Sequence, residues 1–579
     1  MDRPALIEDE RSLRSACERL AARPILACDL ETTGLDPHRD TVLLIQLGDG
    51  RLQVAVDARK VTDLSPLRQV LERPGLTVFH NAQFDLKFLK GLGLEVRRPQ
   101  DTMLLEILLA GGRRVGARTL KASCDRRVGV SLDKAERATF VGFEGTLTES
   151  QIAYAIDDVI ATWHLFLAQV PEIERAGMRE VARIEGAAVD AFAELEWRGI
   201  YLDRAAWEAV LAEAETARDA ARKKLERALL PVVGGDLFGN VHVNYESEEA
   251  LREVFERLGY PDLPNLTRAT LSRLDHPVAA ALLEYRKHQQ VLSRYGEGFL
   301  SHIHPVTGRV HARFRQIGAS TGRASCEAPN LQNIQSGDAF RRAFCAPPGR
   351  KIVTADYAGA ELRIIAEMSG DPVFLETFER GGDLHAIVAS QIFHTEVSKT
   401  VRPELRARAK AINFGLAYGM GAGGLAAETG LPRAEAERLL ETYFRTYPRI
   451  RAFFEDLAQT GLERGYAVTL AGRRLYLEES DDPQRRAHLE RVAKNMPIQG
   501  SSADIVKLAM ARATRRMREE GLDAFIVNTV HDELVFEVSE GDAARAAEVL
   551  EAEMVAAGQA FLHRVPTVVD VHVGDHWAK

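Results

Sequence analysis

The sequence predicts a multidomain protein of mixed α/β and α+β class, on three observations. The first is an N-terminal block, residues 1–172, in which short apolar runs alternate with helix-like segments. The second is a strongly helical stretch from about 180 to 300, rich in Ala, Glu and Arg. The third is a C-terminal part that mixes strand-like runs with long helices. At 579 residues the chain has room for about three or four domains.

The individual elements follow from hydrophobic patterning, which separates strands from helices. In chain order we expect strands at 24–30 and 42–47, helices at 83–89, 152–167 and 205–230, a strand at 351–355, a helix at 360–368, and strands at 525–530 and 534–538. The last two strands flank His531-Asp532-Glu533 and predict a hairpin that presents these residues at its bend.

The composition is that of a globular protein, with 46% hydrophobic and 27% charged residues. No run of about 18 apolar residues occurs, which argues against a membrane span. The first residues lead into a charged segment rather than an apolar signal core, which argues against secretion. Five scattered cysteines, none in a CxxC pair, fit reduced intracellular thiols better than disulfides or a zinc site.

The net charge of −9 taken alone argues against a nucleic-acid partner. Phosphate binding depends, however, on where Lys and Arg lie, and here they cluster at 402–410, at 473–474 and at 485–494. Composition alone therefore does not decide whether the protein binds nucleic acid.

Four acids and a tyrosine in the N-terminal block have the spacing of a metal site. Asp29 and Glu31 end an apolar strand at alternate positions, so their side chains project to one face. Asp85 lies at a helix start, and Tyr154 and Asp158, four apart, share one helical face. Such a set suits hydrolysis of a phosphodiester with two cations, and its oxygen ligands favour Mg²⁺ or Mn²⁺ over zinc.

For any one of these acids a solvated helix or strand end is the simpler interpretation. The ordered set Asp-x-Glu, Asn-x-x-x-Asp and Tyr-x-x-x-Asp is harder to explain that way. It resembles the tyrosine-bearing branch of the DEDD exonucleases, which is used for proofreading. The resemblance implies an RNase H-like fold with all four acids and the tyrosine in catalytic roles.

A second carboxylate pair is predicted in the C-terminal part. Asp356 follows the strand 351–355, and Asp532 lies at the bend of the predicted hairpin, next to Glu533. Two carboxylates on adjacent strands can bridge two Mg²⁺ ions that activate a primer hydroxyl and hold a nucleoside triphosphate.

Between these two acids the sequence predicts a helix with a mixed stripe. Arg406, Lys410, Phe414 and Tyr418 recur every four positions, and Pro403 suits its first turn. The cations can neutralise a triphosphate and the rings can stack on a nucleotide. An ordinary half-buried stripe is the alternative, and the flanking aspartates disfavour it.

Six segments together resemble family A DNA polymerases. They are 356–363, 406–419, 530–535, Thr321-Gly322-Arg323, 329–334 and 495–500. The resemblance covers nearly the whole chain and is greatest to the large fragment of bacterial DNA polymerase I. It implies an exonuclease domain at 1–172 and a right-hand polymerase domain at 173–579. Within the latter, the thumb would span about 180–310, the palm about 311–375 and 490–579, and the fingers about 376–489.

The resemblance also assigns roles at the matching positions. Asp356 and Asp532 would bind the metals, with Glu533 in support, and Lys410 would be a candidate general acid for pyrophosphate. The nucleotide-binding residues would be Glu361, His385, Arg406, Lys410, Phe414 and Tyr418. Within that set, Phe414 would pack on the sugar, and Tyr418 with Glu361 would exclude a ribose 2′-hydroxyl.

DNA contacts are implied in the same way. The residues are Arg323, Asn330, Gln332, Arg491, Asn495, Gln499 and His531. Several would face the primer–template minor groove, where acceptors common to every correct base pair allow geometry to be checked without reading sequence. The partners would be primer–template DNA, deoxynucleoside triphosphates and, in the exonuclease site, a single-stranded 3′ end.

The chain departs from the family at two places. The family often has Ser-Gln-Ile where this chain has Ala358-Gly359-Ala360, so Gly359 cannot supply the glutamine's hydrogen bonds. Bacterial relatives often carry a 5′ nuclease ahead of the exonuclease, and this sequence begins with the exonuclease, so removal of RNA primers is not expected of it.

Three alternative functions remain open at this point. They are an exonuclease whose second half only grips nucleic acid, a scaffold without turnover, and a single-subunit RNA polymerase. The two carboxylate sets argue against the first two, and Glu361, Tyr418 and the exonuclease motifs argue for DNA over RNA. We expect a monomer in the cytoplasm of a bacterial or phage-infected cell, with an organelle as the alternative.

Overall fold

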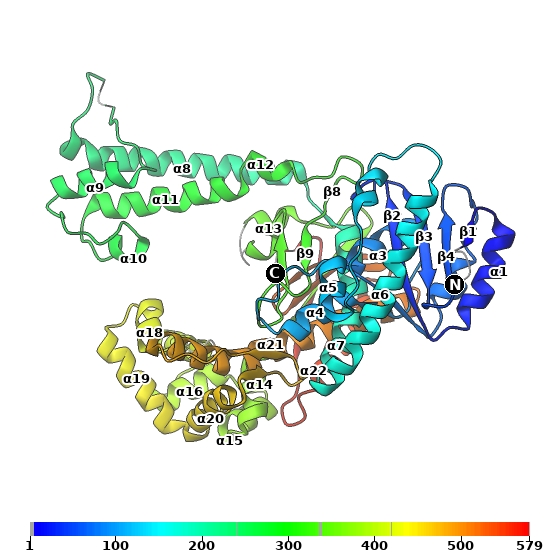
Figure 1. Cartoon of the computed structure of the whole chain (residues 1–579). Helices are drawn as coiled ribbons and strands as arrows, with labels where there is room; N and C mark the ends of the chain where they lie inside the picture. Colours follow the sequence, from blue (N-terminus) through cyan, green and yellow to red (C-terminus); the bar gives the residue numbers. More distant parts are fainter. Residues whose placement is uncertain (1–4, 239, 335–338, 418–419, 578–579) are drawn as a thin grey trace.

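The structure is a computed structural model that describes residues 5–238, 240–334, 339–417 and 420–577. It begins with a six-stranded sheet of order β1-β4-β3-β2-β5-β6, visible at the right of Figure 1. The strands are β1 (Ala5–Ile7), β2 (Ile25–Thr32), β3 (Val42–Gly48), β4 (Gln53–Asp57), β5 (Leu76–Phe79) and β6 (Pro99–Asp101). β2 pairs antiparallel with β3 and parallel with β5, so the predicted strands at 24–30 and 42–47 are confirmed as central neighbours.

Helices cover this sheet and carry part of its chemistry. They are α1 (Glu10–Ala21), α2 (Leu67–Leu71), α3 (Ala82–Gly91), α4 (Thr102–Ala110), α5 (Leu120–Arg127), the 3₁₀ helix η1 (Ala135–Phe140) and α6 (Glu149–Arg175). α6 packs against β2, β3 and β4. It begins with a capping box in which Thr148 and Gln151 satisfy each other's backbone N–H groups. The predicted helices at 83–89 and 152–167 are confirmed.

The next helix, α7 (Arg179–Arg198), lies between two cores. Val189 and Ala193, four residues apart, pack into the core of the six-stranded sheet. Other positions, among them Ile184 and Phe192, pack into the large core of the C-terminal part. The predicted domain boundary at 172 lies within the last turn of α6, just before this shared helix.

A helical arm follows, drawn in green at the upper left of Figure 1. It consists of α8 (Arg204–Val233), α9 (Glu248–Arg257), α10 (Arg268–Leu271), α11 (Pro277–Tyr295) and α12 (Glu297–Leu300). Its distal part has a core of its own in which Leu225, Leu229, Phe255 and Leu282 are fully buried. The predicted helix at 205–230 is therefore the long axis of a separate projecting element.

The C-terminal part is organised on a four-stranded antiparallel sheet of order β14-β15-β11-β16. The strands are β11 (Arg350–Tyr357), β14 (Ala524–Val530), β15 (Glu533–Ser539) and β16 (Val569–Gly574). Smaller elements precede and accompany it: β7 (Ile200–Tyr201), β8 (Arg309–Val310), β9 (Arg313–Arg315), β10 (Ser325–Glu327), η2 (Leu331–Asn333), α13 (Ala339–Ala343), β12 (Tyr466–Val468) and β13 (Arg474–Tyr476). The hairpin predicted around His531 is confirmed as β14–β15.

Helices complete this part. They are α14 (Ala360–Ser369), α15 (Pro372–Glu379), α16 (Leu384–Phe393), α17 (Pro403–Ala417), α18 (Ala422–Thr429), α19 (Arg433–Thr446), α20 (Pro448–Arg464), α21 (Pro483–Glu519) and α22 (Ala543–Gln559). α15 to α20 form a lobe at the lower left of Figure 1, on the side to which the arm also projects. Pro403 is the first residue of α17, as predicted.

A buried ion-pair network fixes α7 against α21. Glu185 is fully buried and accepts from Arg473 and, at 2.6 Å, from Lys507 Nζ. Lys507 Nζ also donates to the carbonyl of Gly322 at 2.7 Å, next to Arg323. Removing one partner from such a network costs about 3–5 kcal/mol because a buried charge is left unpaired. The network therefore stabilises the position of Arg323.

Within the described ranges, no helix combines the length and apolarity needed to cross a lipid bilayer.

Candidate active sites

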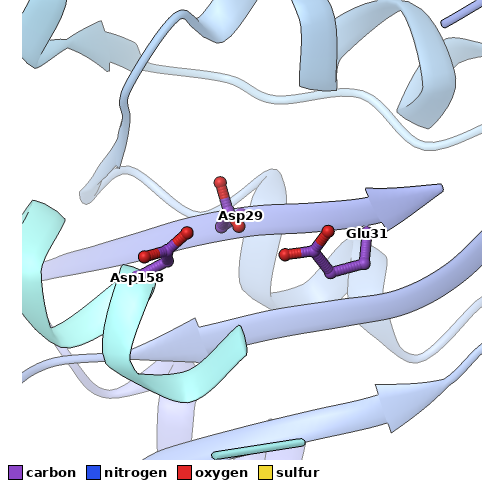
Figure 2. A group of neighbouring side chains, drawn as sticks. All are labelled: Asp29, Glu31 and Asp158. Atoms are coloured by element: carbon purple, nitrogen blue, oxygen red, sulfur yellow. The ribbon is translucent and has the colours of Figure 1, made fainter. Parts of the chain in front are cut away.

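The first site lies where β2 meets α6. One oxygen each from Asp29, Glu31 and Asp158 lies within 4.8 Å of the other two, and Figure 2 shows the three carboxylates turned toward one another. Alternation along β2 places Asp29 and Glu31 on the same face, as the sequence predicted. Oxygen ligands at this spacing fit a divalent cation such as Mg²⁺ or Mn²⁺.

Burial and nearby negative charges raise the pKa values of Asp29 and Glu31. Burial, together with the charge of Asp158, raises the pKa of Asp29 to about 8. Burial and the charge of Asp29 raise the pKa of Glu31 to about 9. Like charges held this close favour the protonated form unless a cation compensates them. The cluster therefore has the electrostatics of a cation site.

Asp85 lies beside this cluster. It is buried, and its Oδ1 accepts from the backbone N–H of Leu30 at 3.1 Å, between the two acids of β2. Asp101 holds the start of α3 by accepting from the N–H groups of Asn81 and Ala82 at 3.0 and 2.9 Å. Burial and the charge of Asp29 raise the pKa of Asp85 well above its usual range. Asp85 thus interacts electrostatically with Asp29, although it is not one of the three converging carboxylates.

Tyr154 completes the predicted set, together with a residue that the sequence did not indicate. Lys134 Nζ donates to both oxygens of Asp158, at 2.6 and 2.5 Å, and to the Tyr154 hydroxyl at 3.3 Å. Burial and the nearby acids raise the pKa of Tyr154, so its hydroxyl stays protonated and can donate a hydrogen bond. Lys134 precedes a 3₁₀ helix in an irregular segment, where no periodic pattern could reveal it.

The second site lies on the four-stranded sheet. Asp356 on β11 is in register with Glu533 on β15, and the N–H of Tyr357 donates to the carbonyl of Asp532 at 3.4 Å. Burial and the charge of Asp356 raise the pKa of Asp532 to about 7. The hairpin bend uses a left-handed conformation at His531, with φ of 56°. The structure therefore brings Asp356 and Asp532 together as predicted.

Glu533 is held by partners that the sequence did not indicate. Its Oε2 accepts from Arg341 at 3.2 Å and from the indole of Trp577 at 3.4 Å, and the side chain is buried. Arg341 is itself buried. This placement fits a supporting role better than direct exposure to a substrate.

The residues predicted to bind a triphosphate lie on two helices of the separate lobe. Arg406 Nε on α17 pairs with Asp383, the N-cap of α16, at 2.7 Å. His385 on α16 contacts Asn413 at 3.0 Å. Its pKa is lowered to about 4, mainly by burial, and the charges of Arg406 and Lys410 lower it further. The structure thus groups Arg406, Lys410 and His385.

The residues predicted to select the sugar lie only partly within the described residues. Glu361 lies in the first turn of α14, where Arg323 donates to it at 2.6 Å. Phe414 lies on α17, but its side chain, like all of Tyr418, is outside the described residues. Gly359, the position of the departure from the family, caps α14 with φ of 67°, a left-handed conformation that glycine adopts without a Cβ penalty.

The predicted DNA-contacting residues fall into two groups. Arg323, Gln332 and His531 line a small cavity of about 30 Å³ beside the hairpin, and Gln332 donates to the carbonyl of Thr529 at 3.2 Å. Asn330 caps η2 through the N–H of Gln332.

The second group lies along α21. Gln499 donates to Asn495 at 3.3 Å, and Arg491 is exposed one turn before Asn495.

Two carboxylate centres lie on two sheets, and the second is accompanied by a cation-bearing helical lobe, as expected from the resemblance to family A DNA polymerases. Comparison with known families agrees. The model for DNA polymerase family A matches residues 209–579, and the model for the 3′-5′ exonuclease family matches residues 4–174. The chain belongs to family A of the DNA polymerases and has a 3′-5′ exonuclease domain ahead of the polymerase domain. The predicted fold class is confirmed.

Individual relatives give the same result. The chain is 32% identical to DNA polymerase I of Chloroflexus aurantiacus over 99% of its own length and 63% of that protein. It is 30% identical to DNA polymerase I of Aquifex aeolicus over 99% of both chains. A solved structure of the POL domain of Pol1 from M. smegmatis, in complex with DNA primer–template and dNTP, is 29% identical with a TM-score of 0.83 and 99% of both chains covered. The chain thus spans less than two thirds of the Chloroflexus relative.

Proposed function

We propose that this chain synthesises DNA on a template from deoxynucleoside triphosphates and removes mismatched 3′ ends at a separate site. The observation that carries the proposal is the presence of two carboxylate centres on two different sheets, one around Asp29 and one around Asp356. The dNTP and primer–template DNA bound to the M. smegmatis structure support the first activity.

For synthesis, Asp356 and Asp532 would hold Mg²⁺, with Mn²⁺ as a substitute and Glu533 in support. Bound cations would activate the primer 3′-hydroxyl and neutralise the triphosphate. The grouping of Arg406, Lys410 and His385 supports triphosphate binding by these residues. Lys410 would also protonate the leaving pyrophosphate.

Selection of the sugar would depend on Glu361, Phe414 and Tyr418. The buried position of Glu361 supports a role in shaping the site rather than in solvent contact.

For degradation, Asp29, Glu31, Asp85 and Asp158 would hold the cations that activate water for attack on the terminal phosphodiester. Tyr154 would orient that water, which its protonated hydroxyl supports. The substrate would be a single-stranded 3′ end.

The duplex would be held by the two groups of polar residues beside the hairpin and along α21. These are Arg323, Asn330, Gln332, Arg491, Asn495, Gln499 and His531. Because both centres lie within one chain, a monomer suffices for both activities. The named relatives are bacterial, which supports the cytoplasm of a bacterial cell as the place of action.

The test is primer extension with Mg²⁺ and deoxynucleotides on matched and 3′-mismatched primers. The wild-type protein should extend both primers, trimming the mismatch first. Asp356→Ala should lose synthesis by at least about 1000-fold yet still degrade, since a metal ligand acts mainly on transition-state charge. Asp29→Ala should extend matched ends and stall on mismatches. A wild-type protein that only degrades DNA would overturn the polymerase assignment.

A further inference from the structure

Lys134 contacts two members of the predicted exonuclease site, Asp158 and Tyr154, without belonging to the metal-binding set. Its ammonium contacts both oxygens of Asp158 and the hydroxyl of Tyr154. It also lies 4.9 Å from the centre of the Tyr154 ring. The Asp158 side chain is 9% exposed and that of Lys134 is 26% exposed, so the pair is shielded from water on the carboxylate side and open on the lysine side.

The segment that carries Lys134 brings a second cation to the same acids. Arg137, one turn later on η1, lowers the pKa of Asp29 and of Glu31 against the larger effect of burial. One short segment therefore carries two cations near the carboxylate cluster, and the ammonium of Lys134 contacts it directly. Anionic substrates bind where such cations can reach them, and a lysine ammonium on its flexible stem can turn between partners.

An open cavity lies beside this segment. Asp133 and Ala135, the neighbours of Lys134, line an open cavity of about 610 Å³ that extends to Tyr154. Cavities of about 300–1,000 Å³ are typical of sites for small-molecule ligands. The cavity is thus bounded by the same segment and by the tyrosine that Lys134 contacts.

We propose that Lys134 is a further residue of the exonuclease active site and that its ammonium binds a phosphate oxygen of the DNA 3′ end. In the free protein its ammonium holds Asp158 and Tyr154. When a cation takes the charge of Asp158, the ammonium turns to the phosphate, which then lies next to that carboxylate. There it stabilises the negative charge that develops on phosphate during attack by water. This inference rests on the proposed exonuclease function.

The alternative role is a structural counter-ion for buried acids, and the two roles differ in measurable ways. A counter-ion supports folding and contributes nothing that depends on the substrate. A lysine that binds phosphate and also competes with the cation for Asp158 affects cation affinity and turnover in opposite directions. Removing its charge strengthens cation binding and slows turnover.

The experiment compares Lys134→Met, Lys134→Arg and the control Lys121→Met, which changes an exposed lysine on α5 of the same domain. Mn²⁺ binding is titrated by electron paramagnetic resonance, and the binding lost in Asp29→Ala defines the exonuclease site. Degradation of a single-stranded oligonucleotide gives kcat and KM. Melting temperatures show whether each variant is folded.

For Lys134→Met we expect Mn²⁺ to bind about 3–10-fold more tightly and kcat to fall about 30–300-fold with a smaller change in KM. Lys134→Arg should stay within about fivefold of wild type in kcat because it keeps the charge. Lys121→Met should change neither quantity. An unchanged kcat, or weaker Mn²⁺ binding, in a folded Lys134→Met protein overturns the proposal.

The two proposals fail in different ways. If the wild-type protein shows no degradation that depends on Asp29, the exonuclease function fails, and the phosphate contact fails with it. The Mn²⁺ titration still decides whether Lys134 competes for Asp158. If degradation is normal and only Lys134→Met is without effect, this inference alone is wrong.

Discussion

The exonuclease and polymerase sites reach a similar carboxylate chemistry through different architectures. In the first, Asp29, Glu31 and Asp158 converge within 4.8 Å, and Lys134 comes from the same domain. In the second, Asp356 and Asp532 lie on the sheet, while Arg406 and the other triphosphate-binding candidates lie on helices of a separate lobe.

The partners in the polymerase site underline this difference. Arg406 is paired with Asp383 of its own lobe, and Glu361 is paired with Arg323 on the sheet side. Arg406 is therefore engaged within its own lobe, and under the proposed function a nucleotide would have to replace this pairing. The exonuclease carboxylates and Lys134 thus come from one domain, whereas the residues predicted for the polymerase site are divided between the sheet and the lobe.

The largest effect on activity is expected from substitutions of the predicted triphosphate-binding residues of the lobe. Arg406→Ala and Lys410→Ala should each lower kcat/KM for a deoxynucleotide about 100–1000-fold, since charge-assisted contacts to a triphosphate are lost. Single-turnover degradation of single-stranded DNA should stay within about twofold of wild type. Arg433→Ala, at an exposed position on α19 of the same lobe, is the matched control. Equal losses in both activities would contradict the separation of the sites.

A medium effect is expected from pH. A cation binds the ionised acid, and the pKa is about 8 for Asp29, about 9 for Glu31 and about 7 for Asp532. On going from pH 9 to pH 7 the ionised fraction falls about tenfold or more for the first two and about twofold for Asp532. The Mg²⁺ concentration for half-maximal activity should therefore rise more for degradation than for synthesis.

This is measured by titrating Mg²⁺ at each pH with Asp29→Ala for synthesis and Asp356→Ala for degradation. Acidification should shift the balance toward synthesis. A parallel rise for both activities would show that the two centres do not differ in acidity.

The smallest effect concerns stability. In the folded protein the pKa of Asp29 is about 8, well above its ordinary value of 3.8. The folded state therefore loses stability relative to the unfolded state as pH rises through that interval, and the loss is complete above about pH 8. Asp29→Asn removes this loss of stability because the amide does not ionise. The melting temperature of the cation-free protein should therefore rise about 2–4 °C at pH 9 and less at pH 5.

Asp125→Asn, at an exposed position on α5, serves as the control in calorimetry with a chelator present. A lower melting temperature for Asp29→Asn at pH 9 would show that the ionised carboxylate is stabilised by contacts that outweigh its burial.

Much of this architecture could be predicted because it is local. Alternation on one strand places Asp29 beside Glu31, and two apolar runs around His531 predict the hairpin that carries Asp532. The separate positions of the two carboxylate sets also follow from the order of the motifs. Local patterns of this kind depend on few residues, so a prediction from them does not require knowledge of the tertiary packing.

What could not be predicted depends on contacts between distant segments. Lys134, Arg341 and Asp383 acquire their roles from partners far away in sequence or on another helix, and no spacing signals them. The bond from Leu30 to Asp85, which sets that acid apart from the converging three, likewise requires the folded domain. The predicted pairing of Glu361 with Tyr418 lies outside the described residues.

Helix α7 has a consequence for anyone who wishes to separate the two activities by cutting the chain. Because Val189 and Ala193 belong to one core and Ile184 and Phe192 to the other, neither half is complete without this helix. A fragment ending before Arg179 would expose the apolar surface that α7 covers, and a fragment ending after Arg198 would carry an uncovered apolar face of its own. Point substitution in one carboxylate set is therefore the cleaner route to a single-activity enzyme.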